Sequence, residues 1–254
     1  MIFAIDIGNT NITFGCIDDK NVYFTERVSS DHNKTPFEYS IIFQSILDFQ
    51  KITCDQIEGS IISSVVPSIG DTIAQAVTRV LGKSPLVVGP GVKTGLNILI
   101  ENPAQLGADL VVAAVGALEK YPCPMIIFDM GTATTVSVID KNRNFLGGMI
   151  APGLRAAAMA MSSSTAQLPD ISLDIPKRVI GRNTVECMRG GLIFGNAAMM
   201  DGLIERIDDE LGAKCTVVAT GGMARYVIPS CRHEIHYDND LLLFGLYLIW
   251  KKNI

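Results

Sequence analysis

A short pattern occurs twice in this sequence, and the two copies lie almost half of its 254 residues apart. Residues 1–18 read MIFAIDIGNTNITFGCID, and residues 125–140 read MIIFDMGTATTVSVID. In each copy an apolar segment leads to Asp, an apolar residue and Gly, and a second alternating segment ends in Asp. The alignment of Asp6 with Asp129 has an offset of 123 residues and pairs Gly8 with Gly131, Asn9 with Thr132 and Asn11 with Thr134. This duplication predicts two related halves.

Each copy is typical of a β-hairpin with a carboxylate at the end of its first strand. Residues 2–5 and 13–17 alternate as strands do, and the Gly and Asn residues between them fit a turn. Glycine lets a backbone approach an anion closely, and neighbouring N–H, Thr and Asn groups donate to phosphate oxygens. An Asp beside the turn can hold a divalent cation or its waters. One Asp-x-Gly is also a common strand-to-turn sequence, but its repetition favours a phosphate site.

The rest of the chain alternates predicted helices with short apolar strands, which indicates an α/β fold. Helices are expected at residues 36–50, 69–81, 108–118, 184–207 and 241–250, and strands at 59–66, 85–88 and 215–219. The Tyr-Pro-Cys-Pro break at residues 121–124 supplies a boundary. We therefore expect domains at 1–122 and 123–254, with a last helix of about 240–252 closing the fold.

Composition excludes several classes of protein. The formal charge of −5, from 21 basic and 26 acidic residues, argues against nucleic-acid binding. Although 48% of residues are apolar, the longest apolar runs (111–118 and 241–250) are far shorter than the roughly 20 residues of a membrane span. Six cysteines without a CxxC pair and three histidines show no zinc spacing. The N-terminus lacks a basic region, so we expect no signal peptide, no membrane partner and a cytoplasmic protein with reduced thiols.

An ordered series of motifs resembles the type III pantothenate kinases, which belong to the acetate and sugar kinase, heat-shock chaperone and actin superfamily. The series runs nearly end to end: DIGNTN at 6–11, GVKTGL at 91–96, NP at 102–103, GAD at 107–109, DMGT at 129–132, GGMIAPG at 147–153, GRNT at 181–184, TGG at 220–222 and Asp240. The resemblance implies two tandem actin-like (ribonuclease H-like) domains with the nucleotide in the cleft between them. It also implies ATP-dependent phosphorylation of pantothenate, the first step of coenzyme A biosynthesis, by a homodimer that uses Mg²⁺ and K⁺ or NH₄⁺.

The same resemblance implies roles for individual residues. The nucleotide is assigned to Asp6, Gly8, Asn9, Thr10, Asn11, Thr13, Thr132, Gly221 and Gly222. The cations are assigned to Asp129 and Asp6. Pantothenate is assigned to Gly107, Ala108, Asp109, Leu110 and Thr184.

Asp109 is the residue to which the resemblance gives the role of general base. Phosphoryl transfer to an alcohol needs an in-line hydroxyl and benefits from a carboxylate that accepts its proton. Asp109 lies in the first turn of an expected apolar helix, where the helix dipole favours a carboxylate, so we expect its pKa to be lowered. A helix-capping role is the alternative for this residue.

Alternatives also stay open for other conspicuous residues. Thr184 is the first residue of the expected helix, and because the pattern is helical from Val185 onward, it fits an ordinary N-cap as well as a substrate contact. Gly221 and Gly222 fit a plain turn at a strand end as well as a passage for adenine. Met159 and Met161 fit the core or a subunit interface, for which the segment 156–161 and the helix 184–207 are candidates.

Two positions depart from the family pattern. Leu110 stands where the family has Arg directly after the aspartate, and Ile100 stands where it has Tyr. In the family both residues help to hold pantothenate. Loss of an arginine that pairs with a carboxylate weakens binding by about 1.5–3 kcal/mol. Arg155, Arg182 and Lys93 are candidates to replace it.

Three functions are therefore compatible with the sequence. The first is a pantothenate kinase. The second is a kinase of the same fold that acts on another small hydroxy compound, and the third is a non-enzymatic, nucleotide-binding regulatory relative. Retention of Asp6, Asp109 and Asp129 argues against the third.

Overall fold

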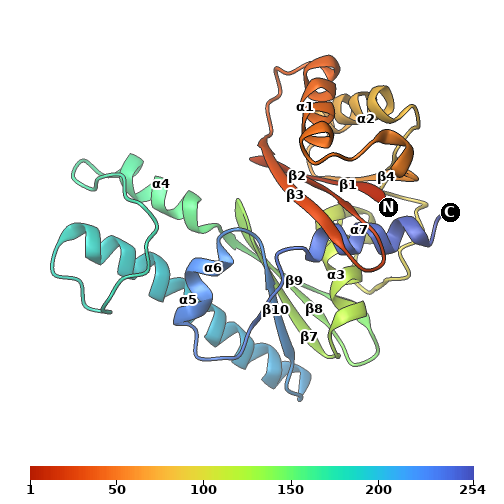
Figure 1. Cartoon of the computed structure of the whole chain (residues 1–254). Coiled ribbons are helices and arrows are strands. Elements are labelled where there is room, and N and C mark those ends of the chain that lie inside the picture. Colours follow the sequence, from red (N-terminus) through yellow and green to blue (C-terminus); the bar gives the residue numbers. More distant parts are fainter. The chain divides into compact units, whose positions relative to one another are not determined.

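The computed structural model describes residues 1–254, whose contacts divide into two compact units (Figure 1). Unit 1 comprises residues 1–96, 101–119 and 240–254, and unit 2 comprises residues 97–100 and 120–239. Each unit is built on one mixed sheet. No helix combines the length and the apolar character that crossing a membrane requires.

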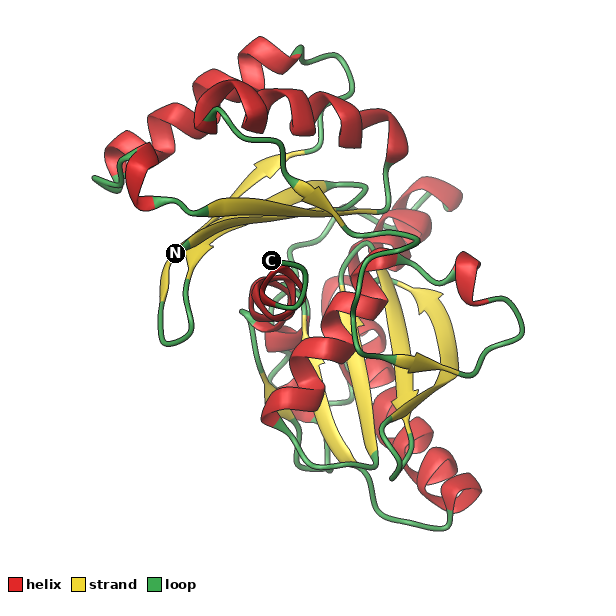
Figure 2. Cartoon of the chain, turned by 90° about the vertical axis from the view of Figure 1, so that its right-hand side faces the viewer, coloured by secondary structure: helices red, strands yellow, loops and turns green.

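Unit 1 has a five-stranded sheet with helices on both faces (Figure 2). The strand order is β3 (Val22–Ser29), β2 (Asn11–Ile17), β1 (Ile2–Ile7), β4 (Gly59–Ser64) and β5 (Leu86–Val87). Strand β2 is antiparallel to both of its neighbours, β3 and β1, and β4 and β5 run parallel to β1. The helices are α1 (Pro36–Phe49), α2 (Pro67–Leu81), α3 (Ala108–Lys120) and α7 (Leu241–Lys251).

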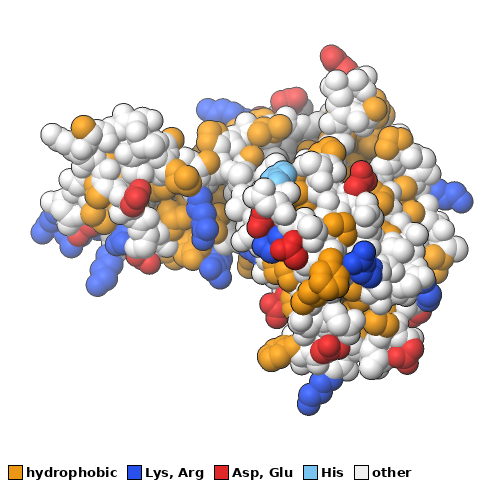
Figure 3. Space-filling view, turned by 90° about the horizontal axis from the view of Figure 1, so that it is seen from above, with side chains coloured by type: hydrophobic (Ala, Val, Ile, Leu, Met, Phe, Trp, Pro, Cys, Tyr) orange, Lys and Arg blue, Asp and Glu red, His pale blue; other side chains and the backbone are white.

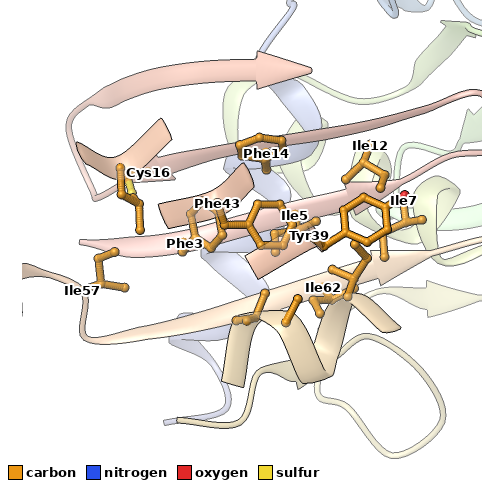
Figure 4. Close-up of a cluster of buried hydrophobic side chains, with 14 of the residues drawn as sticks. Phe3, Ile5, Ile7, Ile12, Phe14, Cys16, Tyr39, Phe43, Ile57 and Ile62 are labelled. Atoms are coloured by element: carbon orange, nitrogen blue, oxygen red, sulfur yellow. The ribbon is translucent and has the colours of Figure 1, made fainter. Parts of the chain in front are cut away.

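The core of unit 1 forms because alternate residues of β1 and β2 point toward α1 and α2. Phe3 and Phe14 from the sheet meet Phe43 from α1, with ring centroids 5.1–5.7 Å apart in edge-to-face pairs (Figure 4). Such pairs add about 0.5–1.5 kcal/mol each beyond the burial of their surface. Helix α1 begins at a capping box in which Thr35 and Glu38 satisfy each other's backbone N–H groups.

Unit 2 has a six-stranded sheet whose centre repeats that of unit 1. The order is β11 (His236–Tyr237), β10 (Thr216–Thr220), β7 (Met125–Met130), β8 (Ala133–Ile139), β9 (Asn144–Pro152) and β6 (Asn97–Ile98). The helices are α4 (Leu154–Ser164), α5 (Thr184–Leu211) and the short α6 (Ala224–Val227). Short 3₁₀ turns occupy Cys54–Gln56 in unit 1, Pro103–Gln105 in unit 1 and Ile228–Ser230 in unit 2.

The duplication extends beyond the two hairpins. Burial follows the same residue-by-residue pattern in β1 and β7, and again in β2 and β8. The third strand of each unit shifts register at a matching place, between Cys16 and Ile17 and between Val138 and Ile139. In each unit the first hairpin strand also has a parallel partner, β4 or β10. The expected α/β class is confirmed.

The strand pairing corrects the alignment of the two copies beyond their turns. Strand β8 begins at Ala133, and Thr134 lies opposite Met130. Thr134 is fully buried on the face that packs against α5, away from Asp129. The alignment of Asn11 with Thr134 was therefore wrong, because the second turn is one residue shorter than the first.

The two units differ from the expected division at residues 120–122, which lie in unit 2, and in two further segments. Residues 97–100 belong with unit 2, because β6 pairs with β9. Helix α7 belongs with unit 1, where it packs on β1, β2 and β4. Its Leu241, Leu243 and Leu246 are buried there.

Six strands and helices were not expected from the sequence, namely β3, β6, β9, β11, α4 and α6. Strand β3 is an exposed edge strand that carries Glu26 and Arg27, so its apolar alternation is weak. Strand β9 contains Gly147 and Gly148, which are poor strand formers. An added Cβ at Gly148 would meet the backbone of Val136, so this glycine permits the close pairing of β9 with β8.

Helices α3 and α7 cross at two glycines. A Cβ added at Gly116 would lie 2.6 Å from the carbonyl oxygen of Leu241, and one added at Gly245 would meet the carbonyl oxygen of Val112. Because these neighbours are backbone atoms, no side-chain rotation relieves the overlap. Glycine at both positions therefore allows α7 to lie close to α3.

We predict that Gly116→Ala and Gly245→Ala each lower the free energy of unfolding by about 1–3 kcal/mol, the usual cost of overpacking. Urea denaturation followed by circular dichroism measures this change. The matched control is Gly195→Ala in α5, where an added Cβ has no neighbour within 4 Å. That variant should gain about 0.5–1 kcal/mol from helix propensity. Equal stability of all three variants would contradict the close crossing.

Candidate functional site

Asp6 lies in a row of polar side chains near the end of β1. Its neighbours across the sheet are Thr13 in β2 and Ser63 in β4. Side chains in register on adjacent strands share one face, and this face is opposite the aromatic core that Ile5 and Ile7 enter. Arg27 continues the row, since its Nε donates to Thr13 Oγ1 at 3.3 Å. Asp6 itself is half-buried.

The turn after Asp6 is held by backbone hydrogen bonds. The N–H of Gly8 donates to the carbonyl of Asn11 at 3.0 Å, which closes the turn. Ser30, directly after β3, braces it, because its hydroxyl donates to the carbonyl of Gly8 at 2.6 Å and its N–H to that of Thr10 at 3.0 Å. Asn9 and Thr10 are exposed at the tip. The turn therefore presents polar groups on a backbone that is already ordered.

Asp109 lies in the first turn of α3, beside the end of the same sheet. A Cβ added at Gly107 would meet Asp109 Oδ1 and would lie 3.8 Å from Cγ1 of Val65. Val65 follows β4, and its N–H donates to the carbonyl of Ile7 at 3.1 Å. The structure thus brings the Gly107–Asp109 segment to the end of β1 that carries Asp6.

Burial sets the protonation of Asp109. Desolvation raises the pKa of this carboxyl above its usual value, and the hydrogen bond from the N–H of Leu110 to Oδ1, at 2.8 Å, opposes the rise only partly. We expected the helix dipole to lower the pKa, and that expectation was wrong. Removal from water disfavours the charged form more than the first turn of the helix favours it.

Unit 2 builds a matching arrangement around Asp129. This aspartate pairs with Thr135 of β8 and Thr220 of β10, and the N–H of Gly131 donates to the carbonyl of Ala133 at 2.9 Å to close the turn. Thr132 is exposed at the tip.

Glycines let the backbone come close to this second aspartate. Gly221 has φ +86, and an added Cβ would lie 2.7 Å from Asp129 Oδ1 and 2.6 Å from the carbonyl oxygen of Met130. Gly222 follows it in the turn into α6. Gly153 packs against the turn that contains Thr132, since a Cβ added at Gly153 would meet the carbonyl oxygen of Thr132. The structure therefore places the Gly221 turn against Asp129.

Thr184 is not the N-cap of α5. Asn183 takes that position, and its Oδ1 accepts a hydrogen bond from the N–H of Glu186 at 2.9 Å. Thr184 is the first helical residue, and its side chain is exposed. The capping alternative for Thr184 is therefore excluded.

The residues of the sequence motifs thus form two groups, one in each unit. Unit 1 brings together Asp6, the 8–11 turn, Thr13 and the 107–110 segment, and unit 2 brings together Asp129, Thr132 and the 221–222 turn. Sequence reasoning missed the flanking hydroxyls of Ser63 and Thr135, and it assigned no role to Thr220 of the motif at 220–222. Their only signal is a polar residue at the end of an apolar strand, and strand pairing is needed to show that they adjoin an aspartate.

The two departures from the family pattern lie in different surroundings. Leu110 is half-buried in α3, and Ile100 lies in unit 2 with its Cγ2 3.8 Å from the position of a Cβ on Gly147. Of the candidate replacements, Arg155 and Arg182 are exposed, while the backbone of Lys93 bonds the Asn253 side chain.

The donor set favours a hard cation that shares its shell with other ligands. No group of three or more His, Cys, Asp or Glu residues is placed to hold a metal ion. Asp6 and Asp129 each offer one carboxylate beside hydroxyl groups, which is the oxygen chemistry Mg²⁺ uses when phosphates and waters complete its shell. The residues present therefore fit a nucleotide-bound cation. Burial raises the pKa of Cys16, Cys215 and Cys231 to about 12, which disfavours the thiolate form that binds a metal ion.

Comparison with known proteins identifies the family of this chain. The family model described as "Type III pantothenate kinase" matches residues 2–206. Relatives of that name from Exiguobacterium sp. and Moorella thermoacetica are 44% and 41% identical, and the matches cover all of this chain and 99% and 100% of theirs. The structure of MreB 5 of Spiroplasma citri bound to AMPPNP superposes with a TM-score of 0.55 at 12% identity, covering 99% of this chain and 96% of that one, which shows the actin-like fold. The chain therefore belongs to the type III pantothenate kinase family.

Proposed function

We propose that this chain transfers the γ-phosphoryl group of ATP to a hydroxyl of pantothenate, at the start of coenzyme A biosynthesis. The observation that carries the proposal is the half-buried Asp109, held in the first turn of α3 at the end of the strand that presents Asp6. The full-length similarity to enzymes named for this reaction supplies the acceptor.

Asp109 acts as the general base. Its raised pKa makes the ionised carboxylate a stronger proton acceptor than an exposed aspartate. As the hydroxyl oxygen of pantothenate bonds to the γ-phosphorus, the bond from that phosphorus to the bridging oxygen of ADP breaks. The hydroxyl proton passes to Asp109, and the leaving electron pair stays on ADP.

The nucleotide is held by the two turns. The 8–11 turn and Thr13 donate to phosphate oxygens from unit 1, and Thr132 does so from unit 2. Gly221 and Gly222 let the backbone pass the adenine.

Asp6 and Asp129 hold Mg²⁺ and a monovalent cation, K⁺ or NH₄⁺. When bound, these cations neutralise phosphate charge during transfer. Asp129 is kept in place by the Gly221 turn, and Asp6 by its position in the central strand of its sheet. Gly107, Ala108, Leu110 and Thr184 contact pantothenate.

The residues at positions 100 and 110 favour an acceptor other than pantothenate as a second candidate. Leu110 and Ile100 supply neither the charge nor the hydroxyl that the family uses for pantothenate. A kinase of the same fold that phosphorylates another small hydroxy compound is therefore the second candidate.

The decisive assay couples ADP release to pantothenate in the presence of Mg²⁺ and K⁺. We expect Asp109→Asn to lower kcat by about 10²–10⁴-fold, the usual contribution of a general base. The exposed Asp71→Asn on α2 is the matched control and should keep its activity. Release with another alcohol but none with pantothenate would replace the first candidate by the second. If no alcohol from a broad panel stimulates release, the chain is a nucleotide-binding relative without kinase activity.

The pH dependence follows from the burial of Asp109. The base works only when ionised, so activity is present above its pKa and is lost as pH falls through it. Because that pKa is raised, we predict that kcat/KM falls with a midpoint above about 3.9, the ordinary value for aspartate. A pH–rate profile measures the midpoint. A midpoint at or below the ordinary value would contradict the role.

We also predict an effect of Asp109→Asn on stability, which separates a loss of catalysis from a loss of folding. A folded-state pKa raised above the unfolded value means that the ionised carboxylate destabilises the folded state at neutral pH. The variant should therefore unfold at the same or a higher denaturant concentration than the wild type at pH 7. An inactive variant that is also less stable would contradict this account.

The protein forms a homodimer in the cytoplasm through an apolar surface of unit 2. Met159 on α4 is 69% exposed, and Ile150, Val179 and Ile180 are 70–81% exposed. On the face that Figure 3 shows, Lys and Arg side chains are interspersed with acidic and apolar ones. This mixed surface does not favour nucleic-acid binding.

We predict a particle of about twice 27.4 kDa for the wild type in sedimentation velocity. Met159→Asp and Ile180→Asp should give the monomer, because burying an unpaired carboxylate in an apolar interface is costly. Phe49→Asp is the control, since Phe49 is 82% exposed in unit 1 and should leave the mass unchanged. Dissociation by Phe49→Asp alone would place the interface on unit 1 instead.

A further inference from the structure

Three buried side-chain hydroxyls have no hydrogen-bond partner. They belong to Ser60, Ser63 and Thr134, which are 0–2% exposed. A buried polar group without a partner costs about 1–3 kcal/mol. Thr134 faces the core of unit 2, whereas Ser60 and Ser63 lie in β4 of unit 1.

Ser60 and Ser63 point to opposite faces of the sheet. Ser60 pairs with Phe3 and shares the face that packs on α1 and α2. Ser63 pairs with Asp6 and shares the other face, to which Gly59 of the same strand also turns. A Cβ added at Gly59 would lie 2.8 Å from the indole nitrogen of Trp250 in α7, which identifies that face. Ser63 is thus the orphan hydroxyl beside the aspartate of the candidate site.

Both halves of the chain have a hydroxyl side chain at the position that pairs with the aspartate. Strand β10 pairs with β7 as β4 pairs with β1, and Thr220 lies beside Asp129 as Ser63 lies beside Asp6. The other hydroxyl is not kept, because Ser60 corresponds to Val217. Two strands that otherwise differ in sequence therefore agree on a hydroxyl next to the aspartate.

We propose that Ser63 is a positioning residue whose hydroxyl donates a hydrogen bond to the Asp6 carboxylate when nucleotide and cation are bound. Rotation about a single side-chain bond gives the hydroxyl its possible directions. A carboxylate oxygen accepts more than one hydrogen bond, so the other contacts of Asp6 do not compete. The bond fixes the carboxylate with one oxygen toward the cation. This inference rests on the proposed role of Asp6 as a cation ligand.

The expected size of the effect follows from other metal sites. Groups that hydrogen-bond a ligating carboxylate typically change metal affinity by about 10–100-fold when they are removed. Ser63→Ala should therefore weaken binding of ADP in the presence of Mg²⁺ by about 10-fold and leave binding of ADP in EDTA unchanged. A merely structural role would not separate these two conditions.

Isothermal titration calorimetry with ADP, in MgCl₂ and in EDTA, tests the inference. Ser60→Ala is the matched control, since it removes an equally buried orphan hydroxyl from the same strand on the opposite face. Ser63→Thr keeps the hydroxyl and should retain the affinity for ADP with Mg²⁺. If Ser63→Ala does not fold, Ser63→Cys, with similar volume and a weak donor, should show the same selective loss.

Two results would overturn the inference. One is an affinity for ADP with Mg²⁺ that is the same in Ser63→Ala and in the wild type. The other is an equal loss in Ser60→Ala. The titration contains no pantothenate, so it tests the role of Ser63 separately from the reaction. If the wild type does not phosphorylate pantothenate, the proposed function is rejected, and the role of Ser63 is still decided by the titration.

Discussion

The structure depends on a carboxylate that each unit places near the end of a strand buried at the centre of its sheet. Every residue of β1 and β7 is buried except the aspartate, which is half-buried. A charge fully removed from water would be very costly, so Asp6 and Asp129 are tolerated because each keeps partial contact with solvent and polar neighbours. The core thereby fixes the position of a carboxylate that is proposed to hold a cation.

Close backbone packing surrounds Asp129 in unit 2 and Asp109 in unit 1. In unit 2 only glycine fits at position 221, because φ is positive and a Cβ would overlap the Asp129 carboxylate. In unit 1 the absence of a side chain at Gly107 leaves room for Asp109 Oδ1, and the crossing of α3 with α7 at Gly116 and Gly245 sets where α3 lies. Loss of side-chain packing at these glycines is offset by the approach of the backbone.

The burial of Asp109 has opposite consequences for stability and for the proposed reaction. The first turn of a helix and a hydrogen bond from Leu110 favour its ionised form, and desolvation disfavours that form more strongly. The result is a carboxyl with a raised pKa, which is a liability for the folded state at neutral pH and an advantage in the proposed role of general base. Ser63 represents a similar case, since an unsatisfied hydroxyl is retained beside the aspartate it is proposed to orient.

The sequence by itself determined the α/β class, the duplicated hairpin and the family, because strand alternation, the Asp-x-Gly turns and the ordered motifs are local patterns. It also located most helices to within a few residues. It did not determine the shorter second turn, the membership of α7 in unit 1 or the pKa direction of Asp109. Only the tertiary structure decided these, and only it set Ser63 beside Asp6, because strand register and desolvation arise from segments far apart in the chain.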